Sequence, residues 1–238
     1  SVVDLEDPGE LVRISLGPKA ALTQTDRGEL LFFDATLSHD SWMSCHSCHT
    51  DGHTNGLLND NFSDASFGAP KRVFSLLGRS DTAPFAWNAS ARDLASQVRN
   101  SIEQTMQADD PAKEDHVQQL VSFLKTLKTP PPIDKVRGTY DAVAVERGRV
   151  LFEKRQCVKC HTPPIYTTPK IYNVGIKDEL DHERFNPPTL RGVGYRSSFF
   201  HDSRAKQLPD VFSVHGHQLS EPLEEKDLQD LLHFLRSL

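Results

Sequence analysis

The sequence predicts a mostly α-helical protein built from two related domains. The pattern Cys-x-x-Cys-His occurs at residues 45–49 and again at 157–161, and these two motifs use all four cysteines of the 238-residue chain. The segments around the motifs repeat one another in the same order, and several carry apolar residues at helical spacing. Neither half has the sustained alternation of a β-sheet. A duplicated helical unit accounts for these observations.

The two motifs indicate covalently bound c-type haem. Two thiols three positions apart can each add to one vinyl group of the same haem, and the histidine that follows then gives its imidazole to the iron. A zinc site would give no reason for a histidine directly after each cysteine pair, and a thioredoxin-like redox pair would need a βαβ setting. We therefore expect two haems c, with proximal ligands at His49 and His161 and attachment at Cys45, Cys48, Cys157 and Cys160.

The composition fits two small haem domains. Hydrophobic residues make up 37% of the chain, which is low for a protein with an ordinary core, and haem adds apolar bulk. The net charge of −6 weighs against a nucleic-acid partner. No apolar run is long enough to cross a bilayer. Because c-type haem is normally attached outside the bacterial cytoplasm, we expect a periplasmic or extracellular protein.

Residues 1–24 do not resemble part of a haem domain. They alternate as short strands do, with turns between them. They are similar to the last strand of the β-propeller repeats that precede di-haem domains in some bacterial proteins. An irregular N-terminal arm is the alternative. The propeller interpretation would make this chain a part of something longer.

The N-terminal haem domain is expected over residues 25–132. Thr25 can cap a first helix that leads toward the haem motif. Apolar stripes predict further helices over 91–106 and 112–127. Three consecutive prolines at 130–132 then end the last helix and form a stiff linker.

The C-terminal haem domain, residues 133–238, has the same order of elements. A helix over 145–152 leads into the second motif, and a short helix is expected over 208–214. Ser220 is expected to cap a final helix that has Pro222 in its first turn.

Matching segments relate the two halves. From the second match onward the halves align without a gap, which places Trp87 opposite His201. The predicted architecture is therefore two cytochrome-c-like haem domains related by a pseudo-twofold duplication. The matches are Arg-Gly-Glu-Leu-Leu-Phe at 27–32 with Arg-Gly-Arg-Val-Leu-Phe at 147–152, and Ser-Leu-Leu-Gly at 75–78 with Thr-Leu-Arg-Gly at 189–192.

These residues resemble the bacterial di-haem cytochrome c peroxidases and their MauG-like relatives. The resemblance covers about residues 25–238 and includes the di-haem domains fused behind β-propellers, so an attached β-propeller is a further expected partner. Besides the two haem motifs it rests on Asp-Gly-His-Thr-Asn-Gly at 51–56, Phe-Ala-Trp-Asn at 85–88, Asn-Pro-Pro-Thr-Leu-Arg at 186–191 and Phe-Phe-His-Asp-Ser-Arg at 199–204.

The resemblance implies two unequal haems. The N-terminal haem has an open or weakly filled distal side where peroxide reacts, the C-terminal haem is six-coordinate and relays electrons, and Trp87 stands between them. The family places the sixth ligand fourteen residues beyond the histidine that matches His201, which here is His215. His217 is the competitor. An imidazole ligand would give a low-potential bis-histidine haem.

The resemblance also implies a distal pocket, from which this sequence departs. Gln97 stands ten residues after the tryptophan and can hydrogen-bond a bound peroxide. The family's acid/base glutamate precedes a methionine, but Thr105 precedes Met106 here and the nearest glutamate is Glu103. The family often binds calcium through a Thr-x-Pro segment, where this chain has Arg-Ser-Ser at 196–198, so calcium stays open.

Two functions from different classes follow. In the first, the chain is a cytochrome c peroxidase-like enzyme: hydrogen peroxide or another small oxidant binds at the His49 haem, and a protein donor supplies electrons through the His161 haem. In a MauG-like variant, a protein substrate is oxidised. In the second, the chain is a non-catalytic electron-transfer module of a larger protein, which the missing glutamate favours. We expect the oxidoreductase, and the sixth position of the His49 iron discriminates the two.

Overall fold

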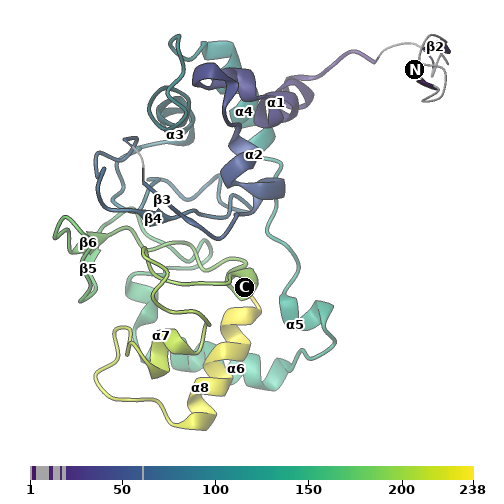
Figure 1. The fold of residues 1–238 in the computed structure, drawn as a ribbon. Coiled ribbons are helices and arrows are strands. Elements are labelled where there is room, and N and C mark those ends of the chain that lie inside the picture. Colours follow the sequence, from purple (N-terminus) through teal and green to yellow (C-terminus); the bar gives the residue numbers. More distant parts are fainter. Residues whose placement is uncertain (1, 4–10, 13–16, 18–19, 61) are drawn as a thin grey trace.

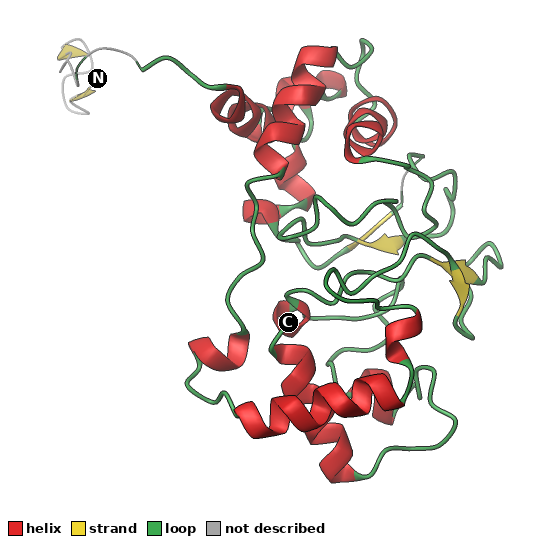
Figure 2. Cartoon of the chain, turned by 180° about the vertical axis from the view of Figure 1, so that it is seen from behind, coloured by secondary structure: helices red, strands yellow, loops and turns green. Residues whose placement is uncertain are grey.

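The computed structural model describes residues 2–3, 11–12, 17, 20–60 and 62–238. Figure 1 shows two mostly helical lobes, one above the other in this view, with loops and short strands between them. The view from behind in Figure 2 shows the same division and the extended segment that joins the lobes. The prediction of a mostly α-helical fold is confirmed.

Within the described residues, the helices and strands divide between the lobes as follows. The first lobe contains α1 (Gln24–Phe33), α2 (Cys45–Cys48), α3 (Leu94–Asn100), α4 (Glu114–Leu124), β3 (Leu58–Asn59) and β4 (Lys71–Arg72). The second contains α5 (Ile133–Val136), α6 (Ala142–Lys154), α7 (Asp210–Ser213), α8 (Glu225–Arg236), β5 (Tyr172–Asn173) and β6 (Arg184–Phe185). Strands β3 and β4 pair antiparallel, as do β5 and β6.

The described part of the N-terminal segment contains β1 (Val2–Val3) and β2 (Leu11–Val12), which pair antiparallel with Val2 opposite Val12. Most of residues 1–24 lies outside the described residues. The interpretation as a propeller remnant or an irregular arm therefore stays a prediction. In the described part of the chain, no helix combines the length and the apolar character needed to cross a membrane.

Each lobe has its own hydrophobic core at a crossing of two helices. In the first lobe α1 packs against α4, and Phe32, Val117 and Leu120 are almost completely buried. In the second, α6 packs against α8 around Leu231 and Leu232. The apolar stripes found in the sequence are the faces that meet at these crossings.

The two crossings repeat the same contact. A Cβ added at Gly28 of α1 would overlap the Gln119 carbonyl oxygen of α4, and one added at Gly148 of α6 would overlap the Asp230 carbonyl oxygen of α8. The glycines therefore allow the helix backbones to approach closely. This repetition of a specific contact supports the internal duplication.

Replacing Gly148 by alanine is expected to lower the free energy of unfolding by about 2 kcal/mol. Alanine gains about 1 kcal/mol of helix propensity, but overpacking costs about 1–3 kcal/mol or more. We expect the upper end, because the clash is with a backbone carbonyl and with Phe234 Cβ at 2.7 Å. Guanidinium chloride unfolding measures the change, and an unaltered midpoint would contradict it. Val150→Ala, an exposed position on the same helix, is the control.

Helix boundaries differ from the sequence predictions where side-chain capping decides them. Helix α1 is capped by Thr23, not Thr25, because Thr23 and Asp26 form a reciprocal capping box. Helix α3 begins at Leu94, where Asp93 accepts from the Ser96 N–H. The following turn, Ser101–Thr105, is π-helical.

The last helix, α8, also starts later than predicted. Its N-cap is Glu224, so Ser220 and Pro222 precede the helix and lie outside its first turn. Glu225 and Asp227 in the first turn complement the helix dipole.

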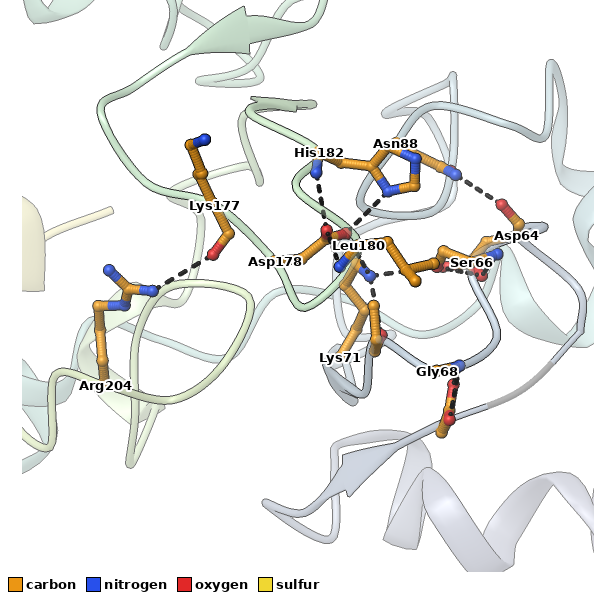
Figure 3. A network of polar contacts seen from close by, with 12 residues as sticks. Asp64, Ser66, Gly68, Lys71, Asn88, Lys177, Asp178, Leu180, His182 and Arg204 are labelled. Atoms are coloured by element: carbon orange, nitrogen blue, oxygen red, sulfur yellow. Dashed lines mark hydrogen bonds and ion pairs between the residues drawn. The ribbon is translucent and has the colours of Figure 1, made fainter.

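A buried ion pair joins the lobes. Lys71 Nζ of β4 lies 3.1 Å from Asp178 Oδ2 of the second lobe, and these side chains are only 7% and 1% exposed. Figure 3 shows that Ser66 and His182 complete the network: Lys71 Nζ also donates to Ser66 Oγ, and His182 Nδ1 lies 3.0 Å from Asp178 Oδ2. This network fixes the loop of residues 64–71 against the second lobe.

Candidate haem sites

The first motif lies at α2 and faces into the first lobe. His49 follows the helix, and its Nδ1–H donates to the Phe74 carbonyl oxygen at 2.8 Å. Burial lowers the pKa of His49 to about 4, so the ring is neutral at pH 7. The hydrogen bond fixes the tautomer and leaves the Nε2 lone pair available to a metal.

A cavity of about 210 Å³ adjoins this motif, and Cys45, Cys48 and His49 all line it. Its wall is mainly apolar, with contributions from α3, α4 and Phe32. Two thiols and a neutral imidazole at one end of an apolar cavity fit a haem c. The apolar wall would cover the macrocycle and keep water from it.

None of the four motif cysteines forms a disulfide. Burial raises the pKa of Cys45 to about 12 and that of Cys157 to about 11. Zinc binding and thiol–disulfide exchange both use the thiolate, which these surroundings disfavour.

The second motif pairs with another histidine. His161 Nδ1–H donates to the Tyr166 carbonyl oxygen at 3.2 Å, and burial lowers the pKa of His161 to about 4. The charge of His217 is a further cause of that shift, so the two imidazoles lie within electrostatic reach. Burial also lowers the pKa of His217 to about 4, and its buried Nδ1 has no hydrogen-bond partner.

His215, which the sequence analysis preferred as the sixth ligand, is exposed. Phe200 makes edge-on contacts with His215 and with His217, with ring centroids 5.3 Å and 5.5 Å apart. Of the two, the half-buried His217 is the one whose charge acts on His161. The placement therefore favours His217 over His215, because spacing along a loop does not determine which side chain turns inward.

The three residues predicted around the N-terminal haem differ in placement. Gln97 and Trp87 line the cavity, and Gln97 Nε2 donates to Ser101 Oγ at 3.2 Å. Glu103 does not line it; its Oε1 accepts from the Ala112 N–H at 3.0 Å, just before α4. That hydrogen bond explains Glu103 without an acid/base role. Among the described lining residues the one carboxylate is Asp64.

Trp87 lies in a line of aromatic rings that crosses the interface. It stacks on Phe74, whose carbonyl holds His49, with centroids 4.4 Å apart. On its other side its edge meets His201 at 6.3 Å. The indole N–H donates to the Arg72 carbonyl oxygen at 2.9 Å, which fixes the ring. Phe200, next to His201 in the chain, contacts His217 near the second motif.

Two buried arginines of the first site were not predicted from the sequence. Arg72 and Arg79 line the cavity and are only 4% and 6% exposed. Lys71 and Arg72 are two adjacent charged residues within an otherwise apolar segment. Such a placement is the sequence signal that indicates a buried charge here. Met43 was missed as well; it lines the cavity together with Met106.

Two cytochrome-c-like domains, each with a half-buried Cys-x-x-Cys-His motif, define a di-haem c-type cytochrome. Residues 23–132 match the family model described as di-haem cytochrome c peroxidase, and residues 145–238 match the one described as cytochrome c. Residues 23–132 therefore belong to the di-haem cytochrome c peroxidase and MauG-like family, and residues 145–238 form a cytochrome c domain. Membership carries the function class of a di-haem oxidoreductase.

Relatives and solved structures agree with this assignment at low identity. The cytochrome c551 peroxidase of Nitrosomonas europaea is 23% identical over 89% of this chain and 78% of its own length. The methylamine utilization protein MauG of Methylophilus methylotrophus is 24% identical over 91% of this chain and 82% of its own length. A hydrazine synthase chain of Kuenenia stuttgartiensis has the same fold, with a TM-score of 0.77, 20% identity and coverage of 98% of this chain and 100% of that one.

Proposed function

We propose that the chain reduces a small oxidant, hydrogen peroxide in the first instance, at the N-terminal haem and receives electrons through the C-terminal haem. In this proposal the haems are attached through the four motif cysteines, with His49 and His161 as proximal ligands and His217 as sixth ligand of the second iron. The partner is a protein electron donor, or a protein substrate in a MauG-like reaction. We infer a periplasmic or extracellular location, because c-type haem is attached outside the bacterial cytoplasm.

The observation that carries the proposal is the difference between the two proximal histidines. His161 lies within electrostatic reach of a second imidazole, that of the half-buried His217. His49 lines a cavity that has no other histidine among its described lining residues. An iron bound at His161 would thus have the imidazoles of His161 and His217 as possible ligands, whereas an iron bound at His49 would have room for a small ligand. This asymmetry is what a peroxidase with one reactive and one relay haem requires.

Each of the residues around the His49 site has a separate role in this proposal. Bound at His49, haem supplies an iron that exchanges electrons with peroxide. The Phe74 carbonyl keeps the His49 ring in one tautomer. The Gln97 carboxamide, held by Ser101, can orient peroxide. Asp64, rather than Glu103, is the better-placed carboxylate for moving a proton, because it lines the cavity.

The aromatic line supports Trp87 as an electron relay. Its ring contacts Phe74 on the side of the first motif and His201 on the side of the second lobe. The indole is 6% exposed and its N–H is bonded, so it keeps one orientation. A fixed, polarisable ring between the two sites shortens each electron hop.

An electron paramagnetic resonance spectrum of the oxidised holoprotein, recorded with and without cyanide, tests the proposal. We expect one high-spin ferric signal that cyanide converts to low spin and one low-spin signal that cyanide leaves unchanged. The half-reduced protein should then turn over hydrogen peroxide. Two low-spin haems that do not bind cyanide in either redox state would contradict peroxide reduction.

Replacing His217 by alanine is expected to convert the low-spin haem to high spin and to leave the other haem unchanged. The reason is that His217 is half-buried and its charge acts on His161, whereas His215 is exposed. His215→Ala is the matched control and should keep the wild-type spectrum. The reverse outcome would assign the sixth ligand to His215.

A non-catalytic electron-transfer module is the second candidate, and the two methionines of the cavity favour it. Met43 and Met106 both line the cavity, and Met106 is 3% exposed. A thioether that fills the sixth position of the His49 iron would block peroxide. In that case Met106→Ala or Met43→Ala would create a high-spin haem and raise peroxide reactivity, whereas the peroxidase proposal predicts high spin in the unaltered protein.

A further inference from the structure

Three arginines lie at the interface between the two haem sites without a carboxylate to pair with. We call Arg72, Arg79 and Arg196 the arginine cluster. Arg72 and Arg79 are almost completely buried, and no ion pair joins any of the three to an acidic residue in the described part of the chain. Burying an unpaired charge carries a large desolvation penalty. A partner of negative charge is therefore expected.

The hydrogen bonds of the cluster are also far from satisfied. A guanidinium has five N–H donors. Within the described residues the Arg79 guanidinium makes none of these bonds to protein; it lies over the Phe74 ring, 3.6 Å from the centroid. Arg72 makes one, from Nε to the Phe200 carbonyl oxygen at 3.2 Å. Because both arginines line the cavity, their free N–H groups are available to a group that enters it.

The cluster reaches both proximal histidines. Arg79 lines the same cavity as His49. Arg196 donates to the Thr189 carbonyl oxygen, and the Thr189 hydroxyl donates to the Ile165 carbonyl oxygen, next to Tyr166, whose carbonyl oxygen accepts from His161. Arg72 and Arg79 both lie over the Phe74 ring, 5.8 Å and 3.6 Å from its centroid. Burial lowers the pKa of Arg196, and the charges of Arg72 and Arg79 lower it further. Arg196 is anchored by hydrogen bonds to the Thr189 and Arg191 carbonyl oxygens. The positive charge thus extends from one haem site to the other.

We propose that the arginine cluster binds the propionate carboxylates of both haems. Guanidinium and carboxylate groups match in geometry and charge, and such pairs are strong where water is excluded. The assignment gives each buried guanidinium a counter-charge that the protein does not supply. It rests on haem binding at the two motifs and does not depend on peroxidase activity.

The same charges bear on calcium. Arg196 begins the segment where the family resemblance places a calcium-binding Thr-x-Pro sequence. Its guanidinium and those of Arg72 and Arg79 would repel a divalent cation. The cluster then supplies the positive charge that a bound calcium would otherwise bring to this place. Both reduction potentials should therefore be unchanged when EDTA is added.

Spectroelectrochemical titration of the holoprotein tests the proposal, with Arg79→Gln and Arg196→Gln compared with wild type. Loss of a buried positive charge stabilises the ferric state and lowers the potential. We expect at least a tenfold change in the ferrous-to-ferric ratio at fixed ambient potential, which is about 59 mV for a one-electron couple. Arg79→Gln should shift the His49 haem more, and Arg196→Gln the His161 haem more.

Further variants separate charge from structure. Arg79→Lys and Arg196→Lys keep the positive charge and should hold the potential near that of wild type, even where a glutamine variant folds poorly. Arg92→Gln, whose side chain is 88% exposed, is the matched control and should change neither potential. Glutamine and lysine variants with equal potentials, or equal shifts of both haems in every variant, would overturn the proposal.

A free anion is the other source of this negative charge, and one more measurement distinguishes it. If the carboxylates belong to the haems, added inorganic phosphate at constant ionic strength should leave both potentials unchanged. Wild-type potentials that respond to phosphate, with a response lost in Arg79→Gln, would show that the cluster takes a solution anion, and the proposal would be wrong.

Discussion

Replacing His49 by alanine is expected to lower peroxide turnover by more than about 100-fold. Changes to residues that merely support a metal ligand already cost about 10–100-fold, and His49 is the predicted ligand itself. Its ring is neutral and held by the Phe74 carbonyl, and no other histidine is among the described residues that line the cavity. Stopped-flow measurement with the half-reduced protein gives the rate, and the absorption spectrum reports the remaining haem.

His46→Ala is the matched control, because His46 lies in α2, just before His49, but bonds to Asp51 near the surface. It should turn over peroxide at close to the wild-type rate. His161→Ala should disturb the low-spin haem and slow the delivery of electrons, while peroxide still binds at the other haem. If His161→Ala removed peroxide binding and His49→Ala kept it, the roles of the two haems would be reversed.

The fold was predictable because its determinants are local or repeated. Apolar stripes at helical spacing predict the helices that cross in each lobe, and the repeated Arg-Gly segment marks the glycine at each crossing. Haem binding was predictable because the attachment motif is contiguous in sequence. Helix ends were less accurate: Thr23 rather than Thr25 caps α1, since the choice depends on a reciprocal bond to Asp26.

The site beyond the motifs was only partly predictable, because its residues meet through tertiary contacts. The spacing from Trp87 predicted a cavity position for Gln97, and Gln97 lines the cavity. Glu103 does not line it and instead accepts a hydrogen bond from the Ala112 N–H. His217 rather than His215 turns inward, and nothing in their two-residue separation decides this. The arginine cluster combines residues more than 100 positions apart, so no local pattern could reveal it.

Replacing Asp178 by asparagine is expected to lower the free energy of unfolding by about 3–5 kcal/mol, the usual cost of removing one partner from a buried ion pair. Lys71 would keep its charge at 7% exposure, with only Ser66 Oγ and the Ala69 carbonyl as partners. Within the same loop, the Leu180 and His182 N–H groups would donate to a neutral amide oxygen in place of a carboxylate. Guanidinium chloride unfolding of the holoprotein measures the loss.

The pH dependence of the difference in free energy of unfolding between wild type and Asp178→Asn gives a sharper test. Burial on its own raises the pKa of Asp178, but hydrogen bonds from the His182 backbone and from Lys71 outweigh it and hold the pKa at about 2, below the ordinary 3.8. A carboxylate whose folded-state pKa is lowered stabilises the fold above its unfolded-state pKa, and this contribution is lost as pH falls through the folded value. The gap between wild type and Asp178→Asn should therefore be full above about pH 4 and shrink toward pH 2. Asp181→Asn, whose carboxylate is 85% exposed in the same loop, should show no such gap. A gap that stayed constant from pH 5 to 2 would mean that packing, and not the charge of Asp178, holds the lobes together.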